Sequence, residues 1–275
     1  MLVSPAELFG DGVFETIHLR PSGPWLLGAH LDRLARSAEL LELDLPPRAE
    51  IEDRVAAAVE GFAAASDRFA SAPFAAREAA LRIIRTRESL HVTVGDIPEA
   101  VRRERRDGVR VISADLGYAV GRPPPWSIMG AKSLSYGPNF AARRWARRHG
   151  ADDLLWFSTE GYALEATTAS LVWLDGATLC TVPAGKAGIL PGITATHLLA
   201  TAALPATTAL LTTAAGAGLC SAERMITADE LAGADALWLA SSLRGLAEVV
   251  ELDGGRRPRS PLTPRLHELL GYETD

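Results

Sequence analysis

The chain has 275 residues, of which 48% are hydrophobic and 23% are charged, a composition typical of a globular protein. This length is enough for one large hydrophobic core or two smaller ones. The net charge of −6 argues against a nucleic-acid partner, which would require a basic face. The arginine clusters at 102–106 and 143–148 are better explained as solvated helix faces.

Targeting signals and metal motifs are missing from the sequence. No apolar stretch is long enough to span a bilayer, and the first residues, MLVSP, lack the basic and apolar regions of a signal peptide. Cys180 and Cys220 have no CxxC spacing, and the six histidines are scattered without metal-ligand spacing. We therefore expect a cytoplasmic protein with reduced thiols, no metal and no membrane partner.

The first 115 residues alternate between strand and helix patterns. Residues 12–19 have a period near two, with Val13, Ile17 and Leu19 on one face, which predicts a half-buried strand. A turn at 21–24 and an apolar run at 25–27 favour a hairpin. Helical or alanine-rich patterns predict three helices, at 30–45, 48–62 and 72–80. Strand patterns follow at 81–86, 91–94 and 109–114.

A proline-rich segment divides the chain. Residues 117–126 contain Gly121 and three consecutive prolines, which do not form regular structure. We therefore expect a smaller N-terminal domain at 1–115, a linker at 116–126 and a larger C-terminal domain at 127–275. Later patterns predict helices at 138–149, from Thr194 and at 263–270, and strands at 153–157, 162–165, 170–175, 178–182, 236–240 and 246–252. Because many strands follow one another directly, we expect an α+β (α/β two-domain) fold with mostly antiparallel strands.

Lys132 and Glu165 stand in surroundings where their chemistry could be used. Lys132 follows the proline segment in the apolar, small-residue sequence IMGAKS. Burial there would favour the neutral amine, which is the form that makes a Schiff base. Glu165 ends an apolar strand, where a carboxylate could pair with the nitrogen of a pyridine ring. The alternatives are a surface lysine and a solvated glutamate.

Two turns could bind a phosphate. The sequence GILPGIT at 188–194 leads into a helix, whose N-terminal N–H groups and dipole suit an anion. The alternative is that Thr194 is an ordinary N-cap. In ASSLRG at 240–245, the hydroxyls of Ser241 and Ser242 follow a strand and could complete a phosphate cup, or they are plain turn residues.

The order of these segments resembles the class IV (fold-type IV) pyridoxal-phosphate-dependent aminotransferase family, and in particular its aminodeoxychorismate lyase branch. The similarity begins at FGDGVFET (9–16), continues through HLDRL (30–34) and extends to the end of the chain. It implies a D-amino-acid-aminotransferase-like fold, pyridoxal 5'-phosphate as cofactor, a homodimer, and a site between a smaller and a larger domain that accepts a small-molecule amino substrate.

The resemblance also implies roles for individual residues. Lys132 matches the lysine that binds the cofactor covalently, and Glu165 matches the carboxylate that pairs with the pyridine nitrogen. The cofactor phosphate would be bound by Arg33, Ile193, Thr194 and Ser242. Without the resemblance, Arg33 would be taken for a surface charge. Arg87 and Arg244 are candidates for binding the substrate carboxylate.

Several positions depart from the family pattern. Ala166, Ser170 and Ala195 replace a common glycine, asparagine and arginine, and Arg87-Glu88 replaces an Arg-Gly turn. The segment before Gly10 is short, and residues 204–218 are longer than is typical. These departures bear on the substrate more than on the cofactor.

Three functions remain open at this point. The stretches around Lys132 and Ser242 favour 4-amino-4-deoxychorismate lyase, which forms 4-aminobenzoate and pyruvate by β-elimination in folate biosynthesis. The alternative within the family is an aminotransferase acting on D-amino acids or branched-chain L-amino acids. A non-catalytic binding relative is the alternative outside enzymes, and the presence of Lys132 and Glu165 argues against it.

Overall fold

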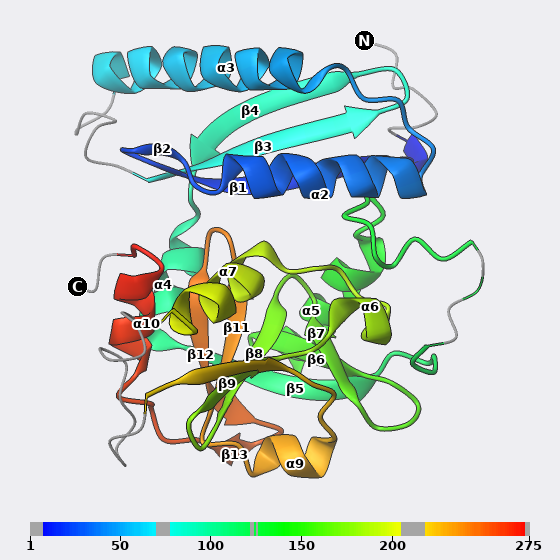
Figure 1. Cartoon of the computed structure of the whole chain (residues 1–275), viewed down its shortest axis with the longest axis vertical. Coiled ribbons are helices and arrows are strands. Elements are labelled where there is room, and N and C mark those ends of the chain that lie inside the picture. Colours follow the sequence, from blue (N-terminus) through cyan, green and yellow to red (C-terminus); the bar gives the residue numbers. More distant parts are fainter. Residues whose placement is uncertain (1–7, 70–77, 122–123, 125, 205–217, 273–275) are drawn as a thin grey trace. The chain divides into compact units, whose positions relative to one another are not determined.

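The computed structural model describes residues 8–69, 78–121, 124, 126–204 and 218–272. The chain forms two compact units (Figure 1): unit 1 consists of residues 1–99 and 128–136, and unit 2 of residues 100–127 and 137–275. This division differs from the expected one, because residues 100–115 lie in unit 2 and residues 128–136 in unit 1. Within the expected linker, residues 122, 123 and 125 lie outside the described residues.

Unit 1 is built on a four-stranded antiparallel sheet with the order β2-β1-β3-β4. Two helices follow β2 in the sequence, and their apolar side chains share one core with those of β1 and β3. The elements are β1 (Gly12–Arg20), β2 (Gly23–Pro24), α2 (Leu27–Leu40), α3 (Arg48–Phe69), β3 (Ala79–Thr86) and β4 (Leu90–Asp96).

Strand β1 confirms the alternation predicted from the sequence. Val13, Ile17 and Leu19 are buried in the core of unit 1. Glu15 has the same parity as these residues and is also 0% exposed. A carboxylate therefore stands among apolar side chains, where it requires partners to offset the loss of hydration.

Two local predictions in unit 1 were wrong. The second arm of the hairpin is only Gly23–Pro24, because Leu26 is in the left-handed region (φ 54°) and α2 begins at Leu27. Ala79 and Ala80, expected in a helix at 72–80, lie in β3 and pair with Leu19 and His18. Sheet pairing has overridden the helix propensity of alanine. Residues 72–77 of that predicted helix lie outside the described residues.

Unit 2 is built on a mixed sheet in which six strands form a closed ring. The path β10-β9-β8-β11-β12-β5-β6-β7 returns to β8, because Glu165 of β7 pairs with Ser170 of β8. The pairings β9–β10, β12–β5 and β5–β6 are parallel and the others in this sheet are antiparallel, so the expected antiparallel majority is confirmed. The strands are β5 (Val109–Asp115), β6 (Asp153–Phe157), β7 (Ala163–Ala166), β8 (Ser170–Asp175), β9 (Thr178–Thr181), β10 (Cys220–Glu223), β11 (Ala236–Ser241), β12 (Gly245–Leu252) and β13 (Gly255–Arg256).

The helices of unit 2 include the three that were predicted, α5 (Gly137–Arg148), α7 (Ile193–Ala202) and α10 (Thr263–Leu269). The structure adds α4 (Glu99–Asp107), α6 (Ala184–Ala187) and α9 (Ala228–Ala232). The apolar faces of the ring strands form the main core of this unit, around Leu171, Trp173 and Leu239. The long stretch at 204–218 falls largely on residues 205–217, which are outside the described residues.

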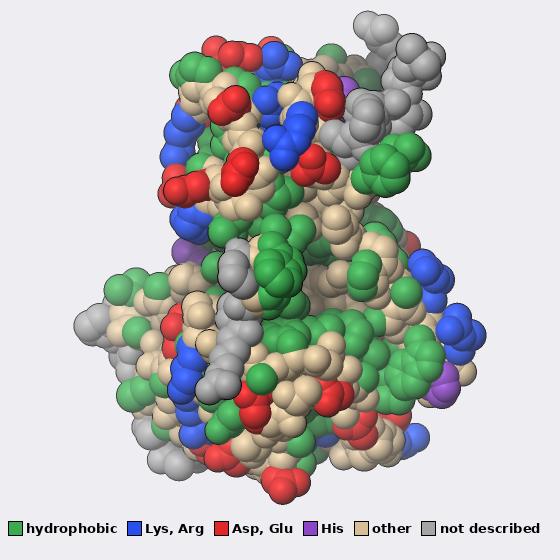
Figure 2. All heavy atoms as spheres, turned by 90° about the vertical axis from the view of Figure 1, so that its right-hand side faces the viewer, with side chains coloured by type: hydrophobic (Ala, Val, Ile, Leu, Met, Phe, Trp, Pro, Cys, Tyr) green, Lys and Arg blue, Asp and Glu red, His purple; other side chains and the backbone are tan. Residues whose placement is uncertain are grey.

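The surface of unit 2 exposes large apolar side chains. Trp126, Phe140, Trp145 and Leu204 are among them, and Figure 2 shows hydrophobic side chains gathered on one face of this unit. Among the described helices, none combines the length and the apolar character needed to cross a bilayer.

Candidate active site

Lys132 is held against the first strand of unit 1. Its carbonyl accepts a hydrogen bond from the Phe14 N–H at 2.9 Å, and its own N–H donates to Ser37 Oγ at 3.0 Å. Ser133 forms a bridge with Val13. A Cβ at Gly12 would lie 2.6 Å from the carbonyl oxygen of Arg85 in β3, so only glycine fits there, and the Gly12 carbonyl accepts from the Leu134 N–H at 2.7 Å. The backbone on both sides of Lys132 is thus fixed to β1.

The amine of Lys132 lies beside two aromatic rings. Its Nζ donates to the Tyr136 hydroxyl at 3.1 Å and lies 4.5 Å from the centre of the Phe14 ring. Phe14 and Tyr136 pack edge to face, with ring centres 5.1 Å apart. Neither aromatic residue was predicted from the sequence, although Tyr136 is four positions beyond Lys132 and Phe14 belongs to the FGDGVFET motif.

Arg33 belongs to a buried cluster with Glu15 and His30. Arg33 donates from Nε to Glu15 Oε1 and from Nη2 to Glu15 Oε2, both at 2.7 Å. His30 Nδ1 lies 2.7 Å from Glu15 Oε2. Burial raises the pKa of Glu15, but the charge and hydrogen bonds of Arg33 and His30 outweigh it and lower the pKa to about 2. Glu15 is therefore ionised at neutral pH.

His30 is the neutral member of this cluster. Burial lowers the pKa of His30 from 6.5, the carboxylate of Glu15 opposes this shift, and the charges of Arg33 and Lys132 add to it. A neutral imidazole beside an ionised carboxylate carries its proton on Nδ1 and donates it. Lys132 and the Arg33 cluster are therefore close enough in unit 1 to influence one another electrostatically.

Glu165 is half-buried in β7 of unit 2, paired with Ser170. Burial, together with the negative charge of Glu165, raises the pKa of Tyr118 to about 12. Tyr118 is thus a neutral phenol near this carboxylate, with its hydroxyl 3.4 Å from the Ala187 carbonyl. Tyr118 lies in the segment predicted as linker, and no sequence pattern had singled it out.

Ile193 and Thr194 open helix α7. The N-cap is Gly192, which makes no side-chain cap, so the alternative that Thr194 caps the helix is excluded. The first N–H groups of a helix have no partner within the helix. Thr194 is 2% exposed, and its Oγ1 has no hydrogen-bond partner among the described residues. An unsatisfied buried hydroxyl beside a helix N-terminus fits an anion such as a phosphate.

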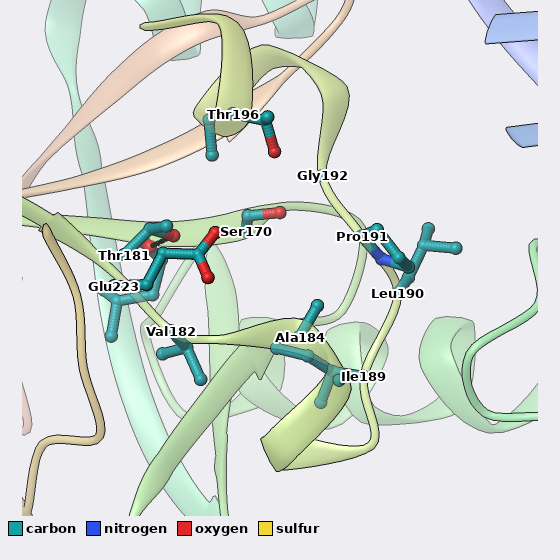
Figure 3. Close-up of a pocket in the computed structure, with 13 residues that line it drawn as sticks. Ser170, Thr181, Val182, Ala184, Ile189, Leu190, Pro191, Gly192, Thr196 and Glu223 are labelled. Atoms are coloured by element: carbon teal, nitrogen blue, oxygen red, sulfur yellow. Dashed lines mark hydrogen bonds between the residues drawn. The ribbon is translucent and has the colours of Figure 1, made fainter. Parts of the chain in front are cut away.

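A cavity of about 200 Å³ lies behind this turn (Figure 3). Pro191, Gly192 and Ala195 form part of its wall, and Glu223 points into it. A Cβ at Gly192 would lie 2.0 Å from Ser170 Oγ, so the turn can approach β8 only with glycine at this position. None of the six residues expected to bind the cofactor lines this cavity, which is therefore separate from the predicted phosphate contacts.

Ser242 lies in the tight turn between β11 and β12. Ser241 pairs with Gly245 across this turn, and Gly245 takes a positive φ of 66°. The Ser242 carbonyl accepts a hydrogen bond from the Tyr272 hydroxyl. The backbone at Ser242 is therefore fixed by the C-terminal segment of the chain.

Both arginines expected to bind substrate are engaged in protein contacts. Arg244 is 3% exposed, and its Nη2 lies 2.9 Å from Glu104 Oε2 and 3.2 Å from Asp153 Oδ2. Arg87 is exposed and donates from Nε to Asp11 Oδ2 at 2.7 Å. These contacts use Nη2 of Arg244 and Nε of Arg87, whereas the buried Nη1 of Arg244 has no hydrogen-bond partner among the described residues. A role of either arginine in binding the substrate carboxylate stays a prediction.

The predicted residues therefore fall into two groups. Lys132 and Arg33 lie in unit 1, and Glu165, Ile193, Thr194 and Ser242 lie in unit 2. Among the described residues, no cluster of three or more histidine, cysteine or acidic side chains could hold a metal ion.

Comparison with known proteins gives a consistent result. A sequence model of the family described as amino-transferase class IV matches residues 12–252. A bifunctional aminodeoxychorismate lyase / D-amino acid transaminase from Mycobacterium tuberculosis is 34% identical over 280 residues, covering 96% of this chain and 90% of the relative.

Solved structures agree with the sequence match. A Mycobacterium tuberculosis protein, described as a hypothetical aminotransferase in its PLP-bound form, has a TM-score of 0.85 and 34% identity, covering 98% of this chain and 92% of its own. A fold IV transaminase from Curtobacterium pusillum has a TM-score of 0.85 and 35% identity, covering 98% and 87%. The fold-type IV architecture expected from the sequence is confirmed.

Proposed function

Because the chain belongs to the class IV aminotransferase family, we propose that it is a pyridoxal-phosphate-dependent 4-amino-4-deoxychorismate lyase that uses Lys132. The family cofactor, pyridoxal 5'-phosphate, is the one expected from the sequence, and one similar structure is described as its PLP-bound form. The observation that carries the proposal is the position of Lys132, whose backbone is fixed to β1 and whose amine meets the Tyr136 hydroxyl at 3.1 Å.

The residues present suit this cofactor. The unsatisfied Thr194 hydroxyl and the N–H groups of Ile193 and Thr194 would bind the phosphate, with Arg33 and Ser242 as further contacts. Glu165 would face the pyridine nitrogen and keep it protonated. Tyr118, a neutral phenol near Glu165, adds no charge of its own beside this carboxylate.

Lys132 would act as both the cofactor anchor and the proton carrier. When bound, pyridoxal phosphate supplies an aldehyde for an amine and a ring that accepts electrons from a bond broken at the substrate amine-bearing carbon. The freed amine of Lys132 then takes the proton from that carbon. Tyr136 orients this amine through its hydroxyl, and Phe14 favours its cationic form after proton transfer.

Two reactions differ in the step after proton removal. In the lyase reaction the enolpyruvyl group leaves, and 4-amino-4-deoxychorismate becomes 4-aminobenzoate and pyruvate. In transamination Lys132 would instead return the proton, and hydrolysis by water would release the substrate skeleton as a keto acid while its amino group stays with the cofactor. The relative named for both activities supports D-amino acid transamination as the second candidate.

Covalent labelling tests the role of Lys132 directly. The chain has two lysines, Lys132 and the exposed Lys186 of α6, so Lys186 is a matched control. Borohydride reduction of the cofactor-loaded protein, followed by peptide mass spectrometry, is expected to mark Lys132 and not Lys186. Lys132→Ala is expected to lose the visible absorption of the bound cofactor, and Lys186→Ala to keep it. Labelling of Lys186 alone would refute the proposal.

A product assay then separates the two reactions. We expect equal amounts of 4-aminobenzoate and pyruvate from 4-amino-4-deoxychorismate with no added keto acid. Turnover of D-alanine with 2-oxoglutarate, without either lyase product, would instead make the protein a transaminase. Labelling at Lys132 with neither activity would leave a binding relative.

We also propose that the protein is a cytoplasmic homodimer. Figure 2 shows hydrophobic side chains gathered on one face of unit 2, and an exposed apolar patch is typical of an interface. The exposed large apolar residues of this unit include Trp126, Phe140 and Trp145. Sedimentation is expected to give twice the 29.2 kDa chain mass. Fully active protein of 29.2 kDa would contradict the dimer.

A further inference from the structure

Two motifs of the N-terminal unit build the Glu15–His30–Arg33 cluster, and the proposed function uses only Arg33. Glu15 comes from FGDGVFET, whereas His30 and Arg33 come from HLDRL. Glu15 is 0% exposed and lies on the same strand face as Val13 and Ile17. Burying a carboxylate among apolar side chains costs free energy unless the carboxylate is paired. A buried glutamate paired with Arg33 and His30 can therefore have a function beyond stability.

The geometry of the cluster fixes the plane of the Arg33 guanidinium. Glu15 accepts from the Nε and Nη2 edge of Arg33 through both of its oxygens, at 2.7 Å each. A guanidinium is planar, so a two-point contact on one edge determines the direction of the opposite N–H groups. His30 donates to Glu15 Oε2 at 2.7 Å and thereby holds the carboxylate itself.

We propose that Glu15 is a positioning residue that aims Arg33 at the cofactor phosphate and so sets the preference of the enzyme for phosphorylated cofactor. The inference rests on the proposed function, because it assumes that Arg33 binds that phosphate. Glu15 would act through Arg33 and would not touch the cofactor itself, while His30 would hold Glu15 in place.

Charge and geometry make opposite predictions for this residue. The carboxylate of Glu15 is negative, so its field opposes the binding of a phosphate dianion. Neutralising Glu15 would therefore strengthen phosphate binding if charge alone mattered. If Glu15 acts by fixing Arg33, the same substitution weakens phosphate binding, because the amide of glutamine cannot accept both N–H groups of the guanidinium edge.

The test compares binding of pyridoxal 5'-phosphate with binding of pyridoxal, which lacks the phosphate. Absorbance titration of the full-length apoprotein gives both dissociation constants, and their ratio reports the phosphate contribution. Glu15→Gln is expected to reduce the preference for the phosphorylated form on the order of tenfold to a hundredfold, with pyridoxal affinity unchanged. Arg33→Leu is expected to reduce it at least as much, and adding Glu15→Gln to that variant is expected to change nothing further.

Two further variants make the result specific. Glu15→Asp keeps the charge but shortens the side chain, so it is a milder test of the two-point contact and remains available if Glu15→Gln does not fold. It is expected to reduce the preference for pyridoxal 5'-phosphate less than Glu15→Gln does. Glu78→Gln is the matched control, since Glu78 pairs with His18 at 2.7 Å in the same unit. It is expected to leave the preference unchanged.

The possible outcomes are distinguishable. Equal loss of affinity for both ligands in the Glu15 variants would reduce Glu15 to a structural role, and an increased preference would show that charge dominates; either overturns the inference. A wild-type protein that shows no preference for pyridoxal 5'-phosphate and no labelling at Lys132 would overturn the proposed function itself.

Discussion

Each unit of the protein buries an arginine that the sequence pointed to as a ligand contact, but the two surroundings differ. In unit 1, Arg33 is 6% exposed and one edge of its guanidinium donates to both oxygens of Glu15. In unit 2, Arg244 is 3% exposed and lies between Glu104 and Asp153. The two buried arginines therefore differ in their geometry: Arg33 makes a two-point contact with one carboxylate, whereas Nη2 of Arg244 is shared between two carboxylates.

The cluster of unit 2 is balanced by protein charges alone. Arg143 donates to Glu104 Oε1 at 2.5 Å and lies 4.0 Å from Asp153, so two arginines face two carboxylates. Arg105 donates to the carbonyls of Leu243 and Arg244 and fixes the turn that carries Arg244. A substrate carboxylate would have to compete with two buried anions there. In unit 1, Nε and Nη2 of Arg33 both donate to one carboxylate, that of Glu15.

Replacing Arg244 is expected to give the largest effect on stability. Arg244→Met leaves two buried carboxylates with one arginine and is expected to cost about 3–5 kcal/mol in the free energy of unfolding. The preference for pyridoxal 5'-phosphate over pyridoxal is expected to stay unchanged, in contrast to Arg33→Leu. Urea unfolding and cofactor titration measure the two quantities.

A second substitution checks that charge balance is the cause. Adding Asp153→Asn to Arg244→Met is expected to recover part of the lost stability, because it removes one unpaired anion. If Arg244→Met instead kept its stability and raised the KM for the amino substrate, Arg244 would be a substrate contact after all.

The pH dependence of stability is expected to show the cluster of unit 1. The pKa of Glu15 is lowered from 4.5 to about 2 in the folded state, so its stabilisation is complete above pH 4.5 and is lost as the pH falls toward 2. The shift corresponds to about 3 kcal/mol. The lowered pKa of His30 acts in the same direction but begins near 6.5, where the unfolded chain takes up a proton first.

Urea midpoints measured between pH 2 and pH 7 test this expectation. Glu15→Gln is expected to lower the midpoint at pH 7 and to flatten its decline below pH 4.5. Glu78→Gln serves as the control, since Glu78 is not in the cluster. A decline of equal steepness in wild type and Glu15→Gln would show that other carboxylates determine the acid sensitivity.

Thr194 sharpens the comparison within unit 2, because its buried hydroxyl has no hydrogen-bond partner among the described residues, whereas Arg244 is ion-paired through Nη2 with two carboxylates. Thr194→Val removes the hydroxyl without changing the shape of the side chain. The apoprotein is expected to gain about 1 kcal/mol in stability, whereas affinity for pyridoxal 5'-phosphate is expected to fall. Thermal unfolding without the cofactor measures the change in apoprotein stability. The additional rise in melting temperature when the cofactor is added measures the change in its affinity. A loss of stability in the apoprotein would mean that the hydroxyl has a partner within the protein.

Local patterns predicted much of the fold, and tertiary pairing decided the rest. The period of two in β1 placed Val13 and Ile17 in the core, and the same period would have placed Glu15 there if an acidic residue had been allowed on the apolar face. By contrast, residues 128–136 join unit 1 through contacts with β1, α2 and the core of that unit, all formed by residues far earlier in the sequence. No local pattern carries those contacts.

The site shows the same limit. The residue types and their order predicted which side chains could serve a cofactor. The partners of Arg244 could not be predicted, because Asp153 is 91 positions away in the sequence and Glu104 lies on the distant helix α4. Tyr118 was missed for a related reason, since it follows β5 and comes near Glu165 of β7 only when both strands pair with β6.

Replacing Arg87 is expected to give the smallest effect on stability, because its ion pair lies on the surface whereas Arg33 and Arg244 are buried. Its side chain is 49% exposed, that of Asp11 is 41% exposed, and the guanidinium also donates to the carbonyls of Leu41 and Glu42. Solvent screens such a pair, so Arg87→Ala is expected to cost less than about 1 kcal/mol in the free energy of unfolding. The KM for the amino substrate is expected to remain at the wild-type value. Asp11→Ala should match this small loss, because it removes the same pair from the other side. An increase in KM with Arg87→Ala but not with Asp11→Ala would give Arg87 a role in binding the substrate carboxylate that exposure and pairing alone do not predict.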